Sequence, residues 1–247
     1  MITLEVAPGI HRVSAANVNC YVIEDQKGIT LVDAGLPRMW EGVMEILKAR
    51  ARMPHEVQAL VLTHAHFDHM GFALRAQQSL GVPVIVHHRD AWLAAHPYRY
   101  ATERNRLLYP FTHPRSLPLL GKMAVSGALN VKGVHGMQLM PDGVMLEIPG
   151  NPVPVHTPGH TDGHCILHLP DRRAVFTGDA LVTLDPYTAE TGPQIVAGAA
   201  TKNTAEAMDS LQAIALTEAQ HVLPGHGAAW HEGAEAAVEA ARKVGAH

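Results

Sequence analysis

The sequence predicts an α/β sandwich, in which helices cover the outer faces of a pair of β-sheets. Short β-rich runs alternate with segments of helical periodicity in the first third of the 247 residues, and the last third repeats this alternation. Hydrophobic residues make up 47% of the chain and charged residues 17%, which supplies enough apolar material for a large core. We therefore expect one domain over residues 1–247.

The first third contains a predicted hairpin followed by a βαβ unit. The hairpin turn ends at Gly28, and a helix after Pro37 would bury an apolar face that begins at Trp40. In a βαβ unit the two strands lie parallel. The expected elements are the strands Cys20–Glu24, Ile29–Asp33, Val57–Leu62 and Val82–Val86, the helix after Pro37, and a helix over Met70–Leu80 that Gly81 ends.

The last third has the same character. Asn203 and Glu206 form an N-terminal capping pattern for one helix, and a second helix carries glutamates early and Arg242 and Lys243 late, as the helix dipole favours. The expected elements are the strands Val144–Ile148, Val153–His156, Cys165–Leu169, Ala174–Thr177 and His221–Leu223, a helix after Asn203, and a helix over Glu232–Val244.

Residues 89–135 interrupt the pattern, and we interpret them as an insertion. The segment contains five arginines and two lysines but only two acidic residues, Asp90 and Glu103. It therefore carries a charge of +5, while the remainder of the chain carries −9. It is rich in aromatic residues and continues into an apolar stretch from Leu117 to Leu129. Two roles are open: a lid whose Arg104 and Arg106 meet an anionic substrate, or the contact of a homodimer.

Composition excludes several classes of protein. The formal net charge of −4 argues against a surface built for nucleic acid. The N-terminus does not resemble a signal peptide, and no run of about 18 apolar residues predicts a membrane span, so we expect a cytoplasmic protein. The cysteines, Cys20 and Cys165, are too few for a disulfide framework and are expected to be buried as small apolar residues.

Histidine and aspartate follow the predicted strands at five places. The stretch "LTHAHFDHMG" places three histidines and an aspartate directly after Val57–Leu62. Ligand sites of open α/β sheets gather beyond the carboxyl ends of the strands. The side chains that follow the five strands are Asp33, His64, His160, Asp179 and His226.

This pattern predicts a binuclear metal site. His64 and His66 lie two residues apart, so in an extended segment they point the same way and can hold one ion, while Asp68 and His69 can hold a second. Imidazole and carboxylate without thiolate favour zinc and leave iron, manganese and nickel open. The other predicted ligands are His160 for the first ion, His226 for the second, and Asp179 as the bridge between them.

The motifs "LVDAG", "THAHFDH", "TPGHTDGH", "TGDA" and "LPGHG" occur in this order, and from about residue 17 to 230 the chain resembles the metallo-β-lactamase superfamily. The resemblance implies an αββα four-layer sandwich with two metal ions at one edge of the sheets. It implies the ligand set given above. It also implies that Asp33 orients ligands by hydrogen bonds, and that His164 stands where related hydrolases often carry histidine.

The expected activity is hydrolysis of a small ester, lactone or thioester by a hydroxide that bridges the two ions, with Asp68 relaying the proton. Asp179 counts against a true β-lactamase, and the 21 residues after His226 are too few for the helical region of glyoxalase II. Quorum-quenching lactonases carry a tyrosine soon after the bridging aspartate, and Tyr187 is the nearest one here. The alternatives are a phosphodiesterase, and a mononuclear-iron oxygenase or metal-binding protein of the same fold.

Overall fold

The computed structural model describes residues 1–106 and 108–246, and its larger sheet contains the first seven strands in chain order. The first three pairs of neighbouring strands are antiparallel, and the last three pairs are parallel. The strands are β1 (Ile2–Ala7), β2 (Ile10–Ala15), β3 (Val18–Asp25), β4 (Gly28–Val32), β5 (Val57–Val61), β6 (Val84–His87) and β7 (Gln138–Met140).

The second sheet has four strands in the order β13-β10-β9-β8, and a two-stranded sheet joins β11 to β12. In the four-stranded sheet β10 and β13 are parallel, whereas β8, β9 and β10 are antiparallel neighbours. The strands are β8 (Val153–His156), β9 (Cys165–Leu169), β10 (Ala174–Gly178), β11 (Val182–Leu184), β12 (Thr191–Gln194) and β13 (His221–Pro224).

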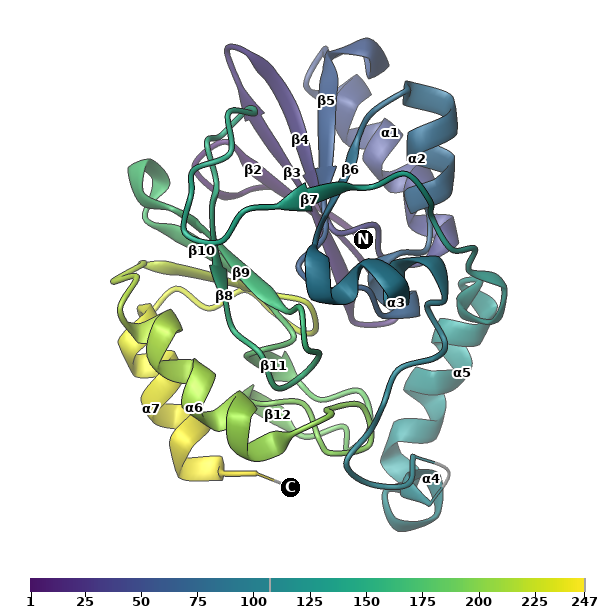
Figure 1. Cartoon of the computed structure of the whole chain (residues 1–247), viewed down its shortest axis with the longest axis vertical. Coiled ribbons are helices and arrows are strands. Elements are labelled where there is room, and N and C mark those ends of the chain that lie inside the picture. The colour runs from purple at the N-terminus through teal and green to yellow at the C-terminus, as the bar shows by residue number, and fades with distance from the viewer. Residues whose placement is uncertain (107, 247) are drawn as a thin grey trace.

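Helices cover the outer face of each sheet, so the layers run helix, sheet, sheet, helix (Figure 1). The helices α1 (Trp40–Ala49) and α2 (Ala73–Leu80) pack on the first sheet, and α6 (Thr204–Ala215) and α7 (Ala234–Val244) pack on the second. Alternation along a strand divides the core. In β3, Cys20 and Val22 face α1, whereas Tyr21 and Ile23 face the second sheet. The predicted αββα sandwich is confirmed.

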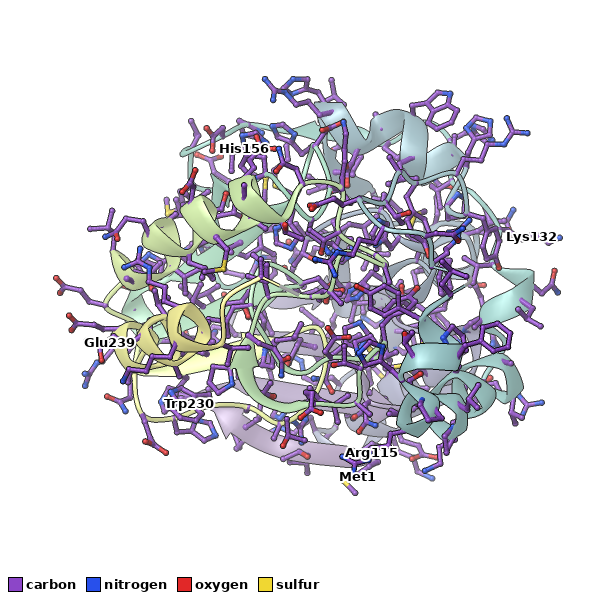
Figure 2. All side chains as sticks on the ribbon, turned by 90° about the horizontal axis from the view of Figure 1, so that it is seen from below. Met1, Arg115, Lys132, His156, Trp230 and Glu239 are labelled. Carbon is purple, nitrogen blue, oxygen red and sulfur yellow. The ribbon has the colours of Figure 1, made fainter. Side chains whose placement is uncertain are left out.

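Segment 89–135 contains α3 (Ala91–Ala95), α4 (Tyr109–Thr112) and α5 (Leu117–Val125). Its Leu93, Met123 and Val134 are buried in the same cluster as α1 and α2, so the segment packs on the first sheet's layer of helices. Lys132 of this segment and Glu239 of α7 lie on opposite sides of the molecule (Figure 2). Within residues 1–106 and 108–246, no helix has the length and apolar character that crossing a membrane requires.

One predicted strand is wrong. Residues 144–148 form an irregular loop, and β8 pairs with β9. Pro149 and Pro152 cannot donate ladder hydrogen bonds, and Gly150 has a φ of +87°. The loop instead makes isolated bonds, such as Gly143 N to Pro154 O at 2.8 Å. The other predicted elements are present with small differences at their ends, and β1, β2, β7, β11 and β12 were not predicted.

Candidate metal centre

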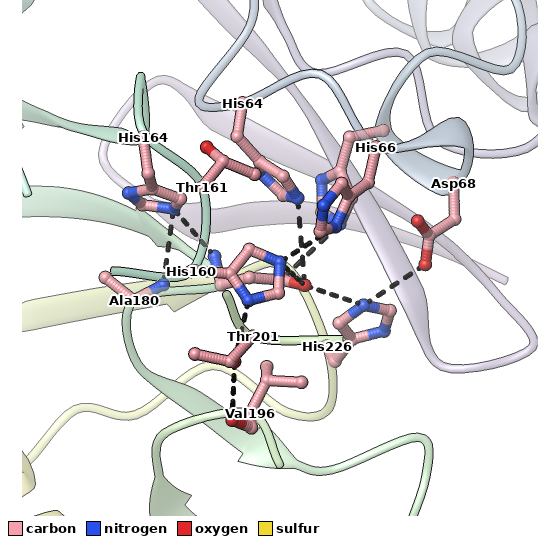
Figure 3. Close-up of polar contacts among 12 residues, drawn as sticks. His64, His66, Asp68, His160, Thr161, His164, Ala180, Val196, Thr201 and His226 are labelled. Carbon is pink, nitrogen blue, oxygen red and sulfur yellow. Dashed lines mark hydrogen bonds and ion pairs between the residues drawn. The ribbon is translucent and has the colours of Figure 1, made fainter. Parts of the chain in front are cut away.

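The predicted ligands come together at one edge of the two sheets, on loops that follow β5, β8, β10 and β13 (Figure 3). They form three overlapping groups, and the ligand atoms of each group lie within 4.8 Å of one another. All of these side chains are buried. The groups are His64, His66 and His160; His64, His69 and Asp179; and Asp68, His69 and His226.

Asp179 lies between the other groups. Its Oδ2 is 3.4 Å from His160 Nε2 and 3.3 Å from His226 Nε2, and its Oδ1 is 3.4 Å from His69 Nε2. His226 Nε2 is also 3.4 Å from Asp68 Oδ2. The Asp179 carboxylate therefore faces His160 of the first group and His226 of the last group, which is the position that a bridging ligand requires.

The site meets a test of fit for cations. The Nε2 atoms of His64, His69 and His226 and the Oδ1 atom of Asp179 are buried and have no hydrogen-bond partner among the described residues. Leaving buried polar atoms unpaired is costly, and divalent ions would satisfy all of them at once. Imidazole and carboxylate are donors that suit zinc, iron or manganese. The residues present therefore fit two divalent ions.

The hydrogen bonds of the outer nitrogens fix which histidine atom faces the centre. Thr201 Oγ1 donates to Val196 O at 2.6 Å, so at 3.1 Å from His160 Nδ1 it must accept that ring's proton. Asn17 O accepts from His226 Nδ1 at 3.2 Å in the same way. In both rings Nε2 therefore faces the centre, and in the neutral ring it carries the lone pair that a metal ligand needs.

Asp33 has the same effect on two further rings. Its Oδ2 accepts from His69 Nδ1 at 2.9 Å, and its Oδ1 accepts from Thr63 N at 2.7 Å. The Thr63 hydroxyl donates to the Asp33 carboxylate and is 3.1 Å from His64 Nδ1, whose proton it accepts. Asp33 thus orients His69 directly and His64 through Thr63. Its own backbone is left-handed, with a φ of +58°.

Charge and burial act in opposite directions on the site histidines. Burial lowers the pKa of His66 and of His160 to about 3, so both rings are neutral near pH 7 with a lone pair available. Burial also acts to lower the pKa of His226, but the Asp179 and Asp68 carboxylates outweigh it and raise the pKa to about 10. Metal ions compete with protons for such nitrogens, so metal binding here is coupled to proton release.

His164 lies beside the ligands but faces the backbone. Its Nε2 accepts from Asp179 N at 3.1 Å and from Ala180 N at 3.2 Å, and its Nδ1 donates to Thr157 Oγ1 at 2.9 Å. Burial holds its pKa well below the usual value for histidine, which keeps Nε2 an acceptor. His164 therefore positions the loop that carries Asp179, and its nitrogens are not available to an ion.

Two residues that the sequence did not single out also contact the site. Asp90 Oδ1 accepts from Gly163 N at 2.8 Å, and Oδ2 accepts from Ala65 N at 3.0 Å and Thr161 Oγ1 at 2.8 Å. It thus ties the loop of His64 and His66 to the loop of His160. Its position after β6 was the available signal. The second residue is Tyr100, whose ring centroid lies 4.0 Å from that of His66.

The predicted substrate residues lie around Tyr100. The Arg106 guanidinium is 4.7 Å from the centroid of the Tyr100 ring, and the Tyr187 hydroxyl is 3.4 Å from the Tyr100 hydroxyl. Arg104 lies between Tyr100 and Arg106 in the sequence, and its backbone N donates to Gly198 O at 2.9 Å. Tyr187 and Arg106 thus both contact Tyr100, which packs on His66, whereas Arg104 packs against the 198 loop.

Tyr100 separates two hollows beside the centre. The first, here called the basic pocket, has a volume of about 160 Å³ and is lined chiefly by His66, His160, Arg89, Trp92, Arg99 and Lys202. The second, here called the apolar cavity, has a volume of about 280 Å³ and is lined chiefly by Phe67, Tyr98, Arg106, Leu120, Met123 and Leu129. Tyr100 lines both.

A model of the metallo-beta-lactamase superfamily matches residues 13–226, which include all of the predicted ligands. The chain belongs to this superfamily. It is similar to solved structures of the same fold: metallo-beta-lactamase family protein TTHA1429 from Thermus thermophilus (TM-score 0.65, 22% identity, 96% of this chain and 78% of the other), and TTHA1623 in a di-iron-bound form (TM-score 0.61, 23% identity, 91% and 95%).

Among curated proteins, the chain is 27% identical to the probable metallo-hydrolase YflN of Bacillus subtilis, over 90% of this chain and 85% of the relative. It is 28% identical to hydroxyacylglutathione hydrolase GloC of Haemophilus influenzae, over 73% of this chain and 72% of the relative. It is also 28% identical to an N-acyl homoserine lactonase of a Bacillus species, over 69% and 64%. The family and these relatives identify the chain as a metal-dependent hydrolase.

Proposed function

We propose that this hydrolase uses two divalent ions, with zinc as the preferred metal, to cleave a small ester, lactone or thioester. The observation that carries the proposal is that His64, His69 and His226 surround the Asp179 carboxylate. Their buried Nε2 atoms and Asp179 Oδ1 have no hydrogen-bond partner among the described residues. When bound, such a pair of ions lowers the pKa of water toward about 7 and polarises a carbonyl.

The protein's own side chains have separate roles in this reaction. Asp179 lies between the histidines of the two predicted ions. Asp33 orients the His69 ring, and His164 positions the backbone of Asp179. Asp68 is 6% exposed at the edge of the centre and is the carboxylate placed to accept and pass on the proton of the attacking water. The Tyr100 hydroxyl is 3.4 Å from that of Tyr187, and we assign this pair of hydroxyls to contacts with the substrate.

The apolar cavity favours an acyl substrate over a phosphodiester. It adjoins Phe67, which stands in the motif between the ligands His66 and Asp68, so an apolar group placed there would leave its carbonyl next to the centre. The names of two relatives describe cleavage of acyl bonds, one in hydroxyacylglutathione and one in a lactone. Phosphodiester hydrolysis is the second candidate, because the basic pocket also lies beside the ligands.

The test combines metal analysis with a substrate panel. Elemental analysis of the protein as purified is expected to give two ions per chain, and reloading metal-stripped protein with Zn²⁺, Mn²⁺ or Fe²⁺ identifies the active metal. The panel contains lactones, thioesters, aryl esters and bis-p-nitrophenyl phosphate. Turnover of the phosphate with none of the acyl substrates would refute the acyl assignment. A single tightly bound ion, with oxygen consumed, would point to the oxygenase class.

A further inference from the structure

The basic pocket lies directly against the metal centre. His66 and His160, two of the three predicted ligands of one ion, form its inner wall, and Tyr100 forms one side. A group seated in this pocket would be part of the same molecule whose reacting carbonyl is at the centre. The charge of the pocket therefore indicates which charge the substrate carries.

Within the part of the chain that the structure describes, two of the three cations of the pocket have no acidic partner. Lys202 is paired with Asp162, whose two carboxylate oxygens lie 2.6 Å from its Nζ, and the other carboxylate, Asp90, already accepts three hydrogen bonds. Arg89 and Arg99 are exposed, and no ion pair of either occurs among residues 1–106 and 108–246. The pocket thus presents two guanidinium groups whose charge the protein does not neutralise.

Three other arginines of this protein lie beside a glutamate. Arg50 lies 2.8 Å from Glu24, Arg52 lies 3.2 Å from Glu56, and Arg75 lies 3.0 Å from Glu41. An arginine fork binds a carboxylate or a phosphate through two parallel hydrogen bonds, and a volume of about 160 Å³ suits a group of that size. The free guanidinium groups beside His66 and His160 are therefore suited to an oxyanion.

We propose that the substrate is an acyl compound that carries an anionic group, a carboxylate or a phosphate, and that Arg89 and Arg99 bind this group in the basic pocket. The apolar remainder of the substrate then enters the apolar cavity on the other side of Tyr100, so the two ends of the substrate diverge at the metal centre. This inference rests on the proposed function, because it takes the reacting bond to be an acyl bond.

The test compares two double variants of the metal-loaded protein. The pocket variant carries Arg89→Gln and Arg99→Gln, and the control variant carries Arg38→Gln and Arg115→Gln. The control changes the net charge equally at two exposed arginines outside the pocket. The probes are neutral 4-nitrophenyl butyrate, mono(4-nitrophenyl) glutarate with a carboxylate on the acyl part, and 3-carboxy-4-nitrophenyl butyrate with one on the leaving part.

For the anionic ester that the wild type prefers, KM is expected to rise tenfold or more in the pocket variant, with kcat within about twofold. Both parameters for the neutral ester, and all parameters of the control variant, should stay within about twofold. An equal change on neutral and anionic esters, or an equal change in the control variant, would overturn the proposal and leave only long-range attraction.

Calorimetry with amide analogues tests binding without turnover and compares the two sources of charge. Glutaric monoanilide carries a carboxylate, 4-phosphonobutyranilide carries a phosphonate, and butyranilide carries neither. At least one anionic anilide should bind the wild type and the control variant tenfold or more tightly than butyranilide, and this preference should disappear in the pocket variant; the tighter one identifies the anion. If the wild type prefers neither the anionic anilides nor the anionic esters over their neutral counterparts, the pocket is refuted. Ester hydrolysis failing while the preference remains would refute the proposed function alone.

Discussion

Replacing Asp90 with Asn tests how the two ligand loops are held together. Asp90 is 1% exposed and accepts hydrogen bonds from Ala65 N, Thr161 Oγ1 and Gly163 N. An asparagine side chain has the same shape, but its NH₂ group cannot accept. In either orientation of the amide, one backbone N–H group, that of Ala65 or of Gly163, faces another donor.

The magnitude follows from these bonds. A hydrogen bond to a charged group contributes about 1.5–3 kcal/mol, and a buried donor left unpaired costs about 1–3 kcal/mol. Burial raises the pKa of Asp90, which shows that the buried charge is itself costly, so its removal returns part of the loss. We expect the metal-free variant to lose about 2 kcal/mol of unfolding free energy, which lowers Tm by about 4–8 °C in a domain of this size.

The metal sites should respond unequally. The His64, His66 and His160 group spans the two loops that Asp90 joins, whereas Asp68, His69 and His226 do not depend on that contact. We expect the affinity of the first site to fall about tenfold or more, as for other partners outside the ligand set, and the second site to change little.

Thermal unfolding in chelator gives the stability, and competition with a chromophoric chelator gives the two dissociation constants. Asp209→Asn, an exposed change on α6, is the matched control. If the Asp90 variant binds both ions as tightly as the wild type while its Tm falls, Asp90 supports the fold only. A variant unchanged in both measurements would refute the reasoning on hydrogen bonds.

Three further predictions follow from the site. Asp179→Asn should bind at least one ion less per chain by elemental analysis and lose more than about a hundredfold in kcat, with a much smaller change in stability; wild-type metal content would refute the bridge. Gly225→Ala places a Cβ 2.2 Å from Asp179 Oδ1 and 2.6 Å from His69 Cε1, so metal binding should weaken and unfolding free energy should fall by about 1–3 kcal/mol. Burial raises the pKa of the Cys20 and Cys165 thiols, so mass spectrometry should find no iodoacetamide adduct on the native protein at pH 8 and two adducts after unfolding.

The positions of the predicted ligands could be read from the sequence because each depends on local structure. His64 and His66 follow a strand whose apolar run is unmistakable, and Asp179 and His226 follow strands of the same kind. Parallel strands end at the same edge of a sheet, so the residues that follow them meet whatever the intervening loops do. The hairpin β11–β12 was missed because its Thr191–Gln194 strand contains glycine and proline, which predict a turn.

The substrate side of the site could not be predicted in the same way, because it depends on the path of a long loop. The charge of segment 89–135 was visible, but the sequence does not show which arginines are near the ligands. Arg104 packs beside Gly198, whereas Arg89 and Arg99 line the pocket against His66. The net charge of a segment therefore does not show which of its arginines lie near the ligands.

The structure also changes how segment 89–135 relates to the chemistry. The sequence supplies no metal ligand from this segment, which favours a role in substrate choice alone. Yet Asp90, near the start of the segment, accepts hydrogen bonds from the two loops that carry His64, His66 and His160. The centroid of the Tyr100 ring also lies 4.0 Å from that of His66. Changes that reshape the segment to accept a new substrate would therefore also shift the ligands. We therefore expect substitutions in this segment that alter substrate range to alter metal affinity as well, and variants selected for one should be measured for the other.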